Sequence, residues 1–508
     1  MTRFLAGLTA ASLLSAAVLV SGACSAGRYR SGPVTDPGAP APFGAIPSKG
    51  QLAWQRQELL MFFHFGQATF SGCDGENPSC NGRAWTESLL LENYRPSEIN
   101  AAQWVKTAAD NGFAGVILTA KHHDGFCLWD NPESTADVAN PACSNHTDVV
   151  RAVADACAER GLTFGLYLSP WDRMIEAAGL GTAEYETMYR NSLKSLMQDY
   201  GTIAEMWFDG NHAGDFDWEE VNRTVLEINP DCVIFSNGGP GCRWVGNEQG
   251  VAGETNWSTL DIAGRGISPS KLPGDYGRYL AVGDKGAGAW CPAESDFSIQ
   301  RTGDRNGWFY GTPDPRKNAR DLMDIYYKTV GRNSVFLMNV PPSDKGVIAD
   351  EEKSVIEEFT KMRKAVFADN LAAGAVARAS SIRGNDDSLY GPRFMLDGDY
   401  DSYFCTDDGV TEAELEFILD GEKTFNRVML QEYIPLGQRV ESFDILIKSG
   451  KDWIPWGNGT KSTIGYKRII LGPAVTTGAV KVRIKSSLAC PVLNGFGLFN
   501  DNVSGITE

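Results

Sequence analysis

Three histidines and one aspartate directly follow short apolar runs of this chain. His64 ends one run, His122 and His123 follow a second, and Asp209 ends a third beside Trp207. Neutral imidazoles can hydrogen-bond to sugar hydroxyls, and an aromatic ring can cover the apolar face of a pyranose. A carboxylate among such groups is suited to acid–base or nucleophilic chemistry on a sugar.

A metal centre is the alternative for the histidines, of which the whole chain has five. A single histidine is more often a hydrogen-bonded structural residue than a ligand. The neighbours His122 and His123 should point to opposite faces of an extended segment, which does not suit one metal ion. The sequence also has no CxxC pair and no Cys–His cluster with zinc spacing. We therefore expect no metal and no cofactor.

Asp209 is the candidate nucleophile, because a carboxylate at the end of a buried strand is costly unless it is hydrogen-bonded or functional. The alternative is a structural aspartate that binds loop amides. Retaining glycoside hydrolysis also needs a protonated carboxyl about 5–5.5 Å from the nucleophile. Glu248, Glu254 and Glu294 are the candidates, all expected in loops. Nearby Trp and Gly residues make an apolar setting that could raise the pKa of Glu248 or Glu254.

The elements that must position these residues follow from hydrophobic patterning. Apolar runs, expected to be strands, occupy 59–64, 116–120, 162–169, 204–209, 233–236 and 334–340. Helical periodicity occupies 101–111, 149–160, 188–200, 218–228, 319–331 and 351–367. This alternation predicts a parallel α/β domain over 46–368. No Gly-x-Gly-x-x-Gly turn follows an early strand, and polar residues gather at strand ends, so a (β/α)8-like barrel is favoured over an open doubly wound sheet.

The hydrophobic pattern changes after the barrel. Stretches of alternating polarity occupy 414–419, 427–433, 443–448, 466–471 and 480–484. They predict a C-terminal β-sandwich over 369–508.

The first residues resemble a secretory signal. Residues 1–26 have one Arg before an apolar stretch that ends in small residues, and 27–45 is a Pro/Gly-rich leader that we expect to be flexible. We therefore expect a secreted protein, with lipid modification at Cys24 as a minor alternative. No later stretch has the roughly 18 consecutive apolar residues of a membrane span.

Cysteine content fits export. Of 11 cysteines, Cys24 would leave with the signal, and the remaining even number suggests several disulfides. Cys73 and Cys80 are close enough to close a local loop, and Cys405 and Cys490 could pair in the C-terminal region. Asn-x-Ser/Thr sites, which weakly favour a glycoprotein, occur at Asn145, Asn222, Asn256, Asn458 and Asn502.

Composition and charge indicate which classes of binding partner are disfavoured. The chain has 508 residues, of which 43% are hydrophobic and 22% are charged, as in ordinary globular proteins. Its net charge of -18 disfavours nucleic acid and anionic membranes as partners.

Several motifs occur in one order across about residues 45–367. They are HFG (64–66), LTAKHHDGFCLW (118–129), LYLSPWDR (166–173), WFDG (207–210), RWVGNE (243–248), PAESDFSI (292–299) and LMNVPPSDKGVI (337–348). In these motifs the sequence resembles the α-L-fucosidases of glycoside hydrolase family 29, and LYLSPWDR and RWVGNE resemble the plant-type α-1,3/1,4 subgroup. The resemblance implies a (β/α)8-like barrel, a retaining mechanism and no metal cofactor.

The resemblance assigns roles by motif. It implies that Asp209 is the nucleophile and Glu248, in GNE, the acid/base, although the 39-residue spacing between them is short for the subgroup. Glu254 and Glu294 remain alternatives for the acid/base. The substrate-binding residues that it implies are His64, His122, His123 and Trp207, with Tyr167, Trp171, Arg243 and Trp85 as weaker candidates.

One motif departs from the family. A Glu-Trp pair usually follows HFG, but here the nearest tryptophan, Trp85, follows Ala84. A carboxylate that binds a fucose hydroxyl is therefore either missing or supplied by Glu76 or Glu87. This departure bears on fucose affinity or linkage rather than on reaction type.

The C-terminal segment MLDGDYDSYF (395–404) resembles the opening of discoidin-like, family 32-type carbohydrate-binding sandwiches. The spacing of Asp397, Asp399 and Asp401 admits Ca²⁺, but a polar turn is favoured.

Function is therefore expected to be hydrolysis of terminal fucose from oligosaccharides or glycoconjugates, α-1,3/1,4-linked. The alternatives are a non-catalytic glycan-binding protein on the same scaffold, a broad-specificity α-fucosidase, and an enzyme of this fold that acts on another sugar, such as an α-galactosidase.

Overall fold

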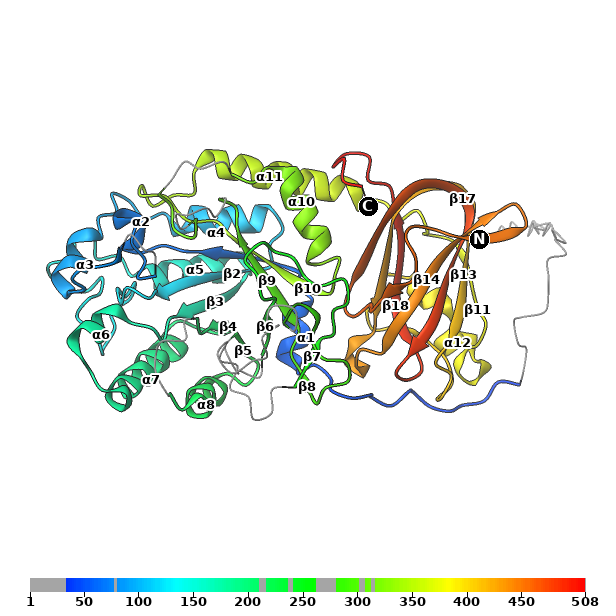
Figure 1. Cartoon of the computed structure of the whole chain (residues 1–508), viewed down its shortest axis with the longest axis horizontal. Coiled ribbons are helices and arrows are strands. Elements are labelled where there is room, and N and C mark those ends of the chain that lie inside the picture. The colour runs from blue at the N-terminus through cyan, green and yellow to red at the C-terminus, as the bar shows by residue number, and fades with distance from the viewer. Residues whose placement is uncertain are drawn as a thin grey trace, which may run out of the picture.

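The computed structural model describes residues 33–76, 80–209, 216–235, 241–261, 280–300, 307–311 and 316–507. A barrel of parallel strands and an antiparallel sheet domain lie next to each other, and the helix α11 (Asp350–Val366) runs from the first toward the second (Figure 1). The fold class expected from the sequence, a (β/α)8-like barrel followed by a β-sandwich, is confirmed. The exact domain boundaries stay a prediction.

The barrel contains an eight-stranded parallel sheet in the order β5-β4-β3-β2-β1-β10-β9-β6. Its strands are β1 (Leu59–Phe63), β2 (Gly115–Lys121), β3 (Thr163–Leu168), β4 (Ile203–Trp207), β5 (Val233–Phe235), β6 (Arg243–Trp244), β9 (Ala293–Ser298) and β10 (Ser334–Asn339). The edge strands β5 and β6 meet through a bridge between Phe235 and Cys242, so the ring is nearly closed.

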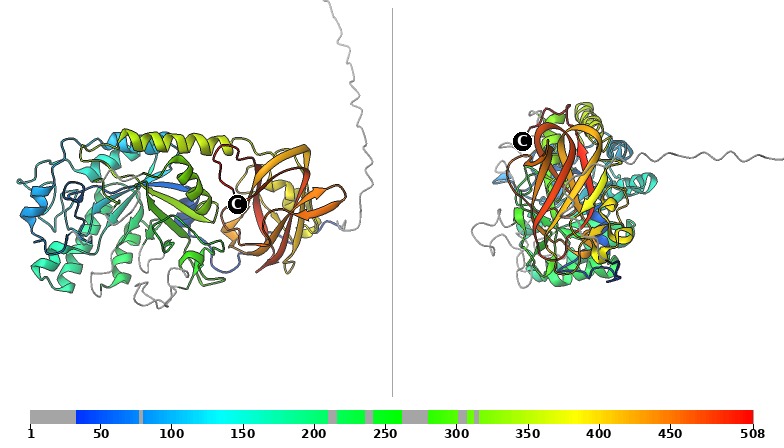
Figure 2. Two further views of the ribbon diagram at one scale, coloured as in Figure 1. Left: turned by 45° about the horizontal axis from the view of Figure 1, so that its top comes forward. Right: turned by 90° about the vertical axis from the view of Figure 1, so that its right-hand side faces the viewer.

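Helices lie around the barrel strands, as the left view of Figure 2 shows. They are α1 (Lys49–Gln55), α2 (Ala68–Ser71), α3 (Glu87–Asn93), α4 (Ala101–Asp110), α5 (Val149–Arg160), α6 (Arg173–Ala178), α7 (Thr182–Asp199), α8 (Trp218–Ile228) and α10 (Ala319–Lys328). Local sequence sets their ends. The side chain of Asp148 caps the N-terminus of α5, and Gly161 ends that helix with a φ of +70°.

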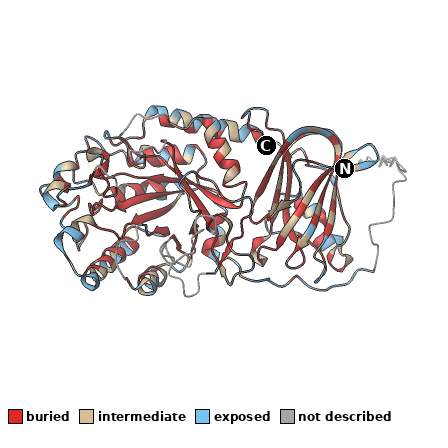
Figure 3. Cartoon of the chain, viewed as in Figure 1, coloured by how far each residue is buried: buried red, intermediate tan, exposed pale blue. Residues whose placement is uncertain are grey.

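Side chains alternate between the two faces of each barrel strand. On β1, Leu60 and Phe62 belong to a cluster inside the barrel, whereas Met61 and Phe63 pack in the outer core under the helices. Because this period is two residues, positions two apart form successive layers up the barrel interior. The strands are accordingly buried on both sides (Figure 3).

Helix α7 and strand β9 are among the barrel elements that differ from the prediction. Helix α7 begins at Thr182, whereas the prediction began at 188. The first turns of this helix are mostly polar, so hydrophobic periodicity did not reveal them. Strand β9 was not predicted, because the carboxylates of Glu294 and Asp296 interrupt its apolar pattern even though every residue of the strand is buried.

The C-terminal domain is one antiparallel sheet folded over a core. Its strands are β11 (Val376–Ala379), β12 (Phe404–Cys405), β13 (Ala413–Glu432), β14 (Val440–Ser449), β15 (Asp452–Pro455), β16 (Lys461–Ser462), β17 (Arg468–Ser487) and β18 (Val492–Phe499). The long strand β13 pairs with β11 through its first part and with β18 through its last, and β17 runs beside both parts. A hydrophobic core that includes Phe417, Phe443 and Phe496 fills the space between the layers.

The described residues also form short helices and a small two-stranded ribbon. The C-terminal domain contains the 3₁₀ turns η3 (Arg383–Asn385), η4 (Pro392–Met395) and η5 (Ile434–Leu436) and the helix α12 (Asp387–Tyr390). Beside the barrel, β7 (Thr259–Leu260) pairs with β8 (Ala289–Trp290).

The flexibility of the 27–45 leader stays a prediction, and the described part of the leader, 33–45, is hydrogen-bonded to the C-terminal domain. Thr35 N–H donates to the carbonyl of Gly384 at 2.8 Å, and Phe43 N–H donates to Leu436 at 3.0 Å. Figure 1 shows this segment running along the C-terminal domain before it enters α1. A Cβ at Gly384 would lie 2.3 Å from Thr35 O, so the close approach requires glycine there. The Pro/Gly composition predicted the absence of helix and strand in 33–45, but it did not predict these hydrogen bonds to the C-terminal domain.

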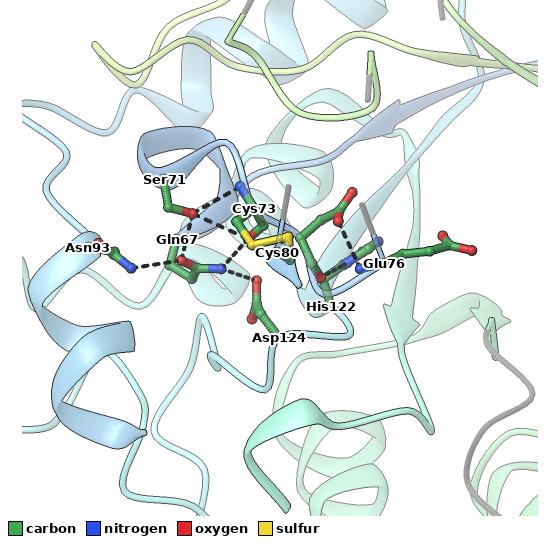
Figure 4. The surroundings of a disulfide bond; sticks show 9 residues. Gln67, Ser71, Cys73, Glu76, Cys80, Asn93, His122 and Asp124 are labelled. Carbon is green, nitrogen blue, oxygen red and sulfur yellow. Dashed lines mark hydrogen bonds between the residues drawn. A yellow bond between two sulfur atoms is a disulfide. The ribbon is translucent and has the colours of Figure 1, made fainter. Parts of the chain in front are cut away.

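The disulfide between Cys73 and Cys80 is confirmed (Figure 4). The other eight cysteines among the described residues are buried thiols, so the expectation of several disulfides, including Cys405–Cys490, is wrong for this part of the chain. Cys490 Sγ lies 3.1 Å from an Arg439 guanidinium nitrogen instead.

Residues 1–26, which resemble a secretory signal and include Cys24, lie outside the described residues. Where the structure is described, no helix combines the length and the apolar character that crossing a bilayer requires. Asn256 is 1% exposed and hydrogen-bonded within the protein, so this glycosylation motif is not accessible to a glycan.

The triad Asp397, Asp399 and Asp401 forms a polar turn, as favoured from the sequence. Asp397 and Asp399 accept hydrogen bonds from the backbone N–H groups of Asp399 and Asp401 at 2.9 and 3.0 Å.

Candidate active site

The three histidines meet at the carboxyl-terminal mouth of the barrel, each held through Nδ1. His64 Nδ1 lies 2.9 Å from Asn339 Oδ1, and His122 Nδ1 lies 3.1 Å from the carbonyl oxygen of Asp74. His123 Nδ1 lies 2.7 Å from Ser169 Oγ. Because amide and peptide oxygens only accept hydrogen bonds, Nδ1 carries the proton in His64 and His122.

Burial keeps the imidazoles of His64 and His122 neutral. It is the largest cause that lowers the pKa of His64 well below its ordinary value, and the neighbouring His122 lowers it further. The pKa of His122 is also lowered, mainly by burial. At neutral pH these rings therefore act as uncharged hydrogen-bonding groups.

Asp209 stands in the same mouth, one layer above Trp207. Its Oδ2 accepts a hydrogen bond from the Tyr167 hydroxyl at 3.1 Å and lies 3.9 Å from His123 Nε2. Ser169 Oγ bonds to the Asp209 carbonyl at 3.1 Å, which ties the backbone down. The side chain is 49% exposed, so its carboxylate is oriented by neighbours and still accessible.

Glu248 is the second carboxyl at this mouth. Partial burial raises its pKa, the charge of Asp209 raises it further, and a hydrogen bond with Trp308 opposes the shift. Glu248 lies on the segment that follows β6. The residue is accessible to solvent, although neighbouring groups partly desolvate its carboxyl. A carboxyl with a raised pKa that interacts with the charge of an accessible carboxylate is suited to acid–base catalysis on a glycoside.

Glu254 does not belong to the site. Its carboxylate forms ion pairs with Arg332 and with Arg468 of the C-terminal domain. Although partial burial opposes it, the charges of these arginines lower the pKa of Glu254, which is the wrong direction for a general acid. Glu254 therefore joins the two domains.

Glu294 lies too deep in the barrel to reach a substrate. It is fully buried, and its register on β9 places it beside Val335 of β10, below the mouth. Burial, together with the charge of Glu205 on β4, raises its pKa well above the ordinary value.

A cluster of Glu205, Cys242 and Glu294 inside the barrel brings three potential ligand atoms within 4.8 Å of one another. Metal ligation needs deprotonated groups. Burial raises the pKa of Glu205 to about 7 and that of the Cys242 thiol well above its ordinary value, and both shifts disfavour the deprotonated forms that a metal needs.

Glu205 instead supports Trp207 from below. The indole N–H groups of Trp54 and Trp207 donate hydrogen bonds to its carboxyl at 2.7 and 3.0 Å.

Arg243 is not placed to bind substrate. It is 1% exposed, and its guanidinium donates to the carbonyls of Leu280 and Cys291 and to Asn256. Its hydrogen bonds connect the segments that contain Asn256, Leu280 and Cys291.

The weaker aromatic candidates lie near the imidazoles. The Trp171 ring centroid is 5.0 Å from that of His123, and the Tyr167 ring stacks on His122 at 5.3 Å. Trp85 is buried, with the Arg173 guanidinium 5.7 Å from its ring centroid.

Sequence reasoning missed three residues at the mouth. Trp308 and Phe309 lie after β9, with ring centroids 5.1 and 5.5 Å from that of His64. Asp296, one layer above Glu294, accepts a hydrogen bond from the Trp244 indole at 2.8 Å. Burial raises its pKa well above the ordinary value, and the charge of Glu248 adds to this. The aromatic run GWFY after PAESDFSI was the available signal.

The two carboxylates considered for the missing Glu-Trp pair differ in position. Glu76 follows the first cysteine of the disulfide, and its pKa is raised by partial burial and then by the charges of Asp209, Asp74 and Glu248. Glu87 instead accepts hydrogen bonds from Thr135 and from Asn140, away from this mouth.

Comparison with known proteins identifies the family. The sequence profile described as alpha-L-fucosidase matches residues 81–365. Alpha-L-fucosidase 1 of Arabidopsis thaliana is 37% identical over 479 residues, which cover 92% of this chain and 90% of that protein. The chain belongs to the α-L-fucosidase family.

Solved structures agree with this assignment to the α-L-fucosidases. A putative α-L-fucosidase from Bacteroides thetaiotaomicron matches with a TM-score of 0.82 and 35% identity, covering 91% of this chain and 99% of that one. A glycoside hydrolase family 29 fucosidase of Ruminococcus gnavus, solved in complex with fucose, matches with a TM-score of 0.79 and 28% identity, covering 92% and 97%. The chain is thus an α-L-fucosidase of glycoside hydrolase family 29, and residues 376–493 match the F5/8 type C domain.

Proposed function

We propose that this chain is a retaining exo-fucosidase that releases terminal α-1,3/1,4-linked L-fucose from oligosaccharides or glycoconjugates. The observation that carries the proposal is the accessible Asp209 carboxylate, which is oriented by Tyr167. Its charge interacts with a second carboxyl, Glu248, whose raised pKa favours the protonated form.

The two carboxyls divide the reaction between them. Asp209 attacks the anomeric carbon of fucose while Glu248 gives its proton to the glycosidic oxygen, so the aglycone leaves as an alcohol. The ionised Glu248 then takes a proton from water, which displaces Asp209 and releases fucose with its original α configuration. The hydrogen bond from Tyr167 holds the attacking carboxylate in one orientation for both steps.

The remaining mouth residues bind the sugar. Neutral His64 and His122, together with His123, offer hydrogen-bonding groups to the fucose hydroxyls, and Trp207 shapes the floor. Tyr167 and Trp171 contribute contact area beside the histidines. The fucose complex of the Ruminococcus gnavus relative supports fucose as the ligand of this site.

Linkage is tested directly with a panel of α-1,2-, α-1,3-, α-1,4- and α-1,6-fucosylated oligosaccharides. The proposal predicts release from the α-1,3 and α-1,4 substrates alone. Release from all four would indicate a broad-specificity enzyme. Turnover of an aryl α-galactoside in place of an aryl α-L-fucoside would overturn the sugar assignment, and fucose binding without turnover would indicate a glycan-binding protein.

Export is the second part of the proposal, supported by the signal-like residues 1–26. N-terminal sequencing of the mature protein should find cleavage near Ala23 or Ala26. A mature chain that retains Met1 would contradict export through this signal.

A further inference from the structure

A carboxyl lies inside the barrel, directly beneath the floor of the mouth. Glu205 and Trp207 are successive inward-facing residues of β4, and Asp209 follows two residues later. In register, Glu205 stands between Gly165 of β3 and Val233 of β5, and it is 2% exposed. A buried carboxyl is costly unless hydrogen bonds satisfy it, so the partners of Glu205 indicate what it does there.

Two buried indoles bind the two oxygens of this carboxyl. Trp54 Nε1–H donates to Glu205 Oε2 at 2.7 Å, and Trp207 Nε1–H donates to Glu205 Oε1 at 3.0 Å. An indole nitrogen only donates, so both rings depend on Glu205 as their acceptor. Because the two hydrogen bonds use different oxygens, Trp54 fixes the orientation in which Glu205 presents Oε1 to Trp207.

Stacking fixes the plane of the Trp207 ring. Its centroid lies 3.5 Å from that of Phe235, with 1° between the ring planes, and the Phe62 ring meets it edge-on at 5.0 Å. Stacking alone does not decide how the indole is turned within this plane. A turned ring would carry Nε1 away from Glu205, so the hydrogen bond selects one orientation of the Trp207 ring.

Trp54 reaches Glu205 from the end of the barrel opposite the mouth. It belongs to α1, which ends at Gln55, shortly before β1 begins at Leu59. The amino-terminal end of β1 is the end away from the histidines. The Trp54 ring is buried and belongs to the cluster inside the barrel. Two hydrogen bonds therefore connect a helix that precedes the barrel to the floor of the mouth.

We propose that Glu205 and Trp54 are positioning residues for the sugar site, which hold the Trp207 indole in the orientation that forms the floor. The proposal rests on the fucosidase function proposed above, and neither residue touches the sugar. The floor packs on fucose both before and during the reaction. A displaced floor should therefore weaken binding more than it slows the chemical step.

The test compares variants of the full chain on an aryl α-L-fucoside, with free L-fucose as inhibitor. Trp54→Phe removes the N–H that holds Glu205, and Glu205→Gln leaves one acceptor oxygen for two indoles. Each variant should raise KM and the fucose inhibition constant about threefold to tenfold, as expected for one lost hydrogen bond. In each, kcat should stay within about twofold of the wild type.

A double variant separates positioning from a general structural role. Trp207→Phe removes the N–H through which Glu205 acts, so it should itself raise the fucose inhibition constant. Adding Trp54→Phe to Trp207→Phe should change that constant further by less than about twofold, because both changes interrupt the same chain of hydrogen bonds.

The matched control is Trp456→Phe. Trp456 is buried in the C-terminal domain, and its Nε1–H donates to the carbonyl of Pro473 at 2.8 Å. Its replacement removes the same group from a buried indole and should leave KM and fucose inhibition those of the wild type. If Glu205→Gln does not fold, Trp54→Phe decides the matter, because it introduces no polar group into the barrel.

Three results would overturn the inference. They are unchanged KM and fucose inhibition in folded Trp54→Phe, an effect of Trp54→Phe that is equally large when Trp207 is already Phe, and a lowered kcat with unchanged fucose inhibition. A wild-type chain that does not hydrolyse the aryl fucoside would refute the proposed function instead, so the two failures can be told apart.

Discussion

The hydroxyl of Tyr167 donates a hydrogen bond to Asp209 Oδ2 over 3.1 Å, between residues of neighbouring barrel positions. Tyr167 is on β3, and β4, which pairs with it, ends two residues before Asp209. The register of the two strands therefore sets this contact. Although Asp209 itself lies just beyond β4, the side chain that orients its carboxylate belongs to a barrel strand.

Removing this hydrogen bond should slow the reaction. We expect Tyr167→Phe to lower kcat about tenfold to a hundredfold, as is typical when a hydrogen bond to a charged group is lost. Steady-state kinetics on an aryl α-L-fucoside measures this effect. A variant as fast as the wild type would show that Asp209 does not need this orientation.

Glu248 should show the pattern of a general acid. Glu248→Gln should slow substrates with poor leaving groups far more than activated aryl fucosides, which need little protonation. The raised pKa of Glu248 keeps it protonated to higher pH, so the wild-type rate should fall as pH rises through that pKa. In the variant this alkaline fall should disappear. The pH–rate profiles of both proteins test the assignment.

Glu254 should affect stability and not catalysis. In Glu254→Gln, the nearly buried Arg468 and the mostly buried Arg332 lose their carboxylate partner. Because Glu254 itself is largely exposed, we expect a loss of about 1–2 kcal/mol in unfolding free energy. Denaturant unfolding measures the loss, and kcat/KM on the aryl fucoside should remain that of the wild type. A leaving-group dependence here would move the acid/base role from Glu248 to Glu254.

Asp124 should make stability depend on pH. Burial raises its pKa from 3.8 to about 7, so the folded chain holds a proton that the unfolded chain releases. Stability from this group is fully present below the unfolded pKa and is lost as pH rises toward 7. Asp124→Asn should remove about 3–4 kcal/mol of that dependence between pH 4 and 7. Unfolding at several pH values compares the slopes, and an unchanged slope would contradict the buried protonated carboxyl.

Most barrel strands were predictable because both of their faces are buried. Strands β1 to β5 and β10 are nearly continuous apolar runs, whereas β9 was hidden by Glu294 and Asp296. The same two-residue period that places Asp209 above Trp207 also places Glu294 one layer below Asp296. Applied to PAESDFSI, it would have directed attention to Asp296 instead of Glu294.

Other features depend on contacts between distant segments, which local patterns do not encode. The short spacing of Cys73 and Cys80 was enough to predict their disulfide. Cys405 and Cys490 share a core cluster but do not bond, since Cys490 faces Arg439. Trp308 and His64 are far apart in the sequence, and the folded barrel brings their rings to a centroid distance of 5.1 Å. Glu248 was found by its motif, and its electrostatic interaction with Asp209 emerged from the structure.

The most direct measurement is azide rescue of Asp209→Ala on an aryl α-L-fucoside. The account predicts that this variant loses nearly all activity and that added azide restores turnover, with β-fucosyl azide as the product. A folded variant that remains inactive in azide would contradict Asp209 as the nucleophile. So would a variant that releases fucose at the wild-type rate when no azide is added.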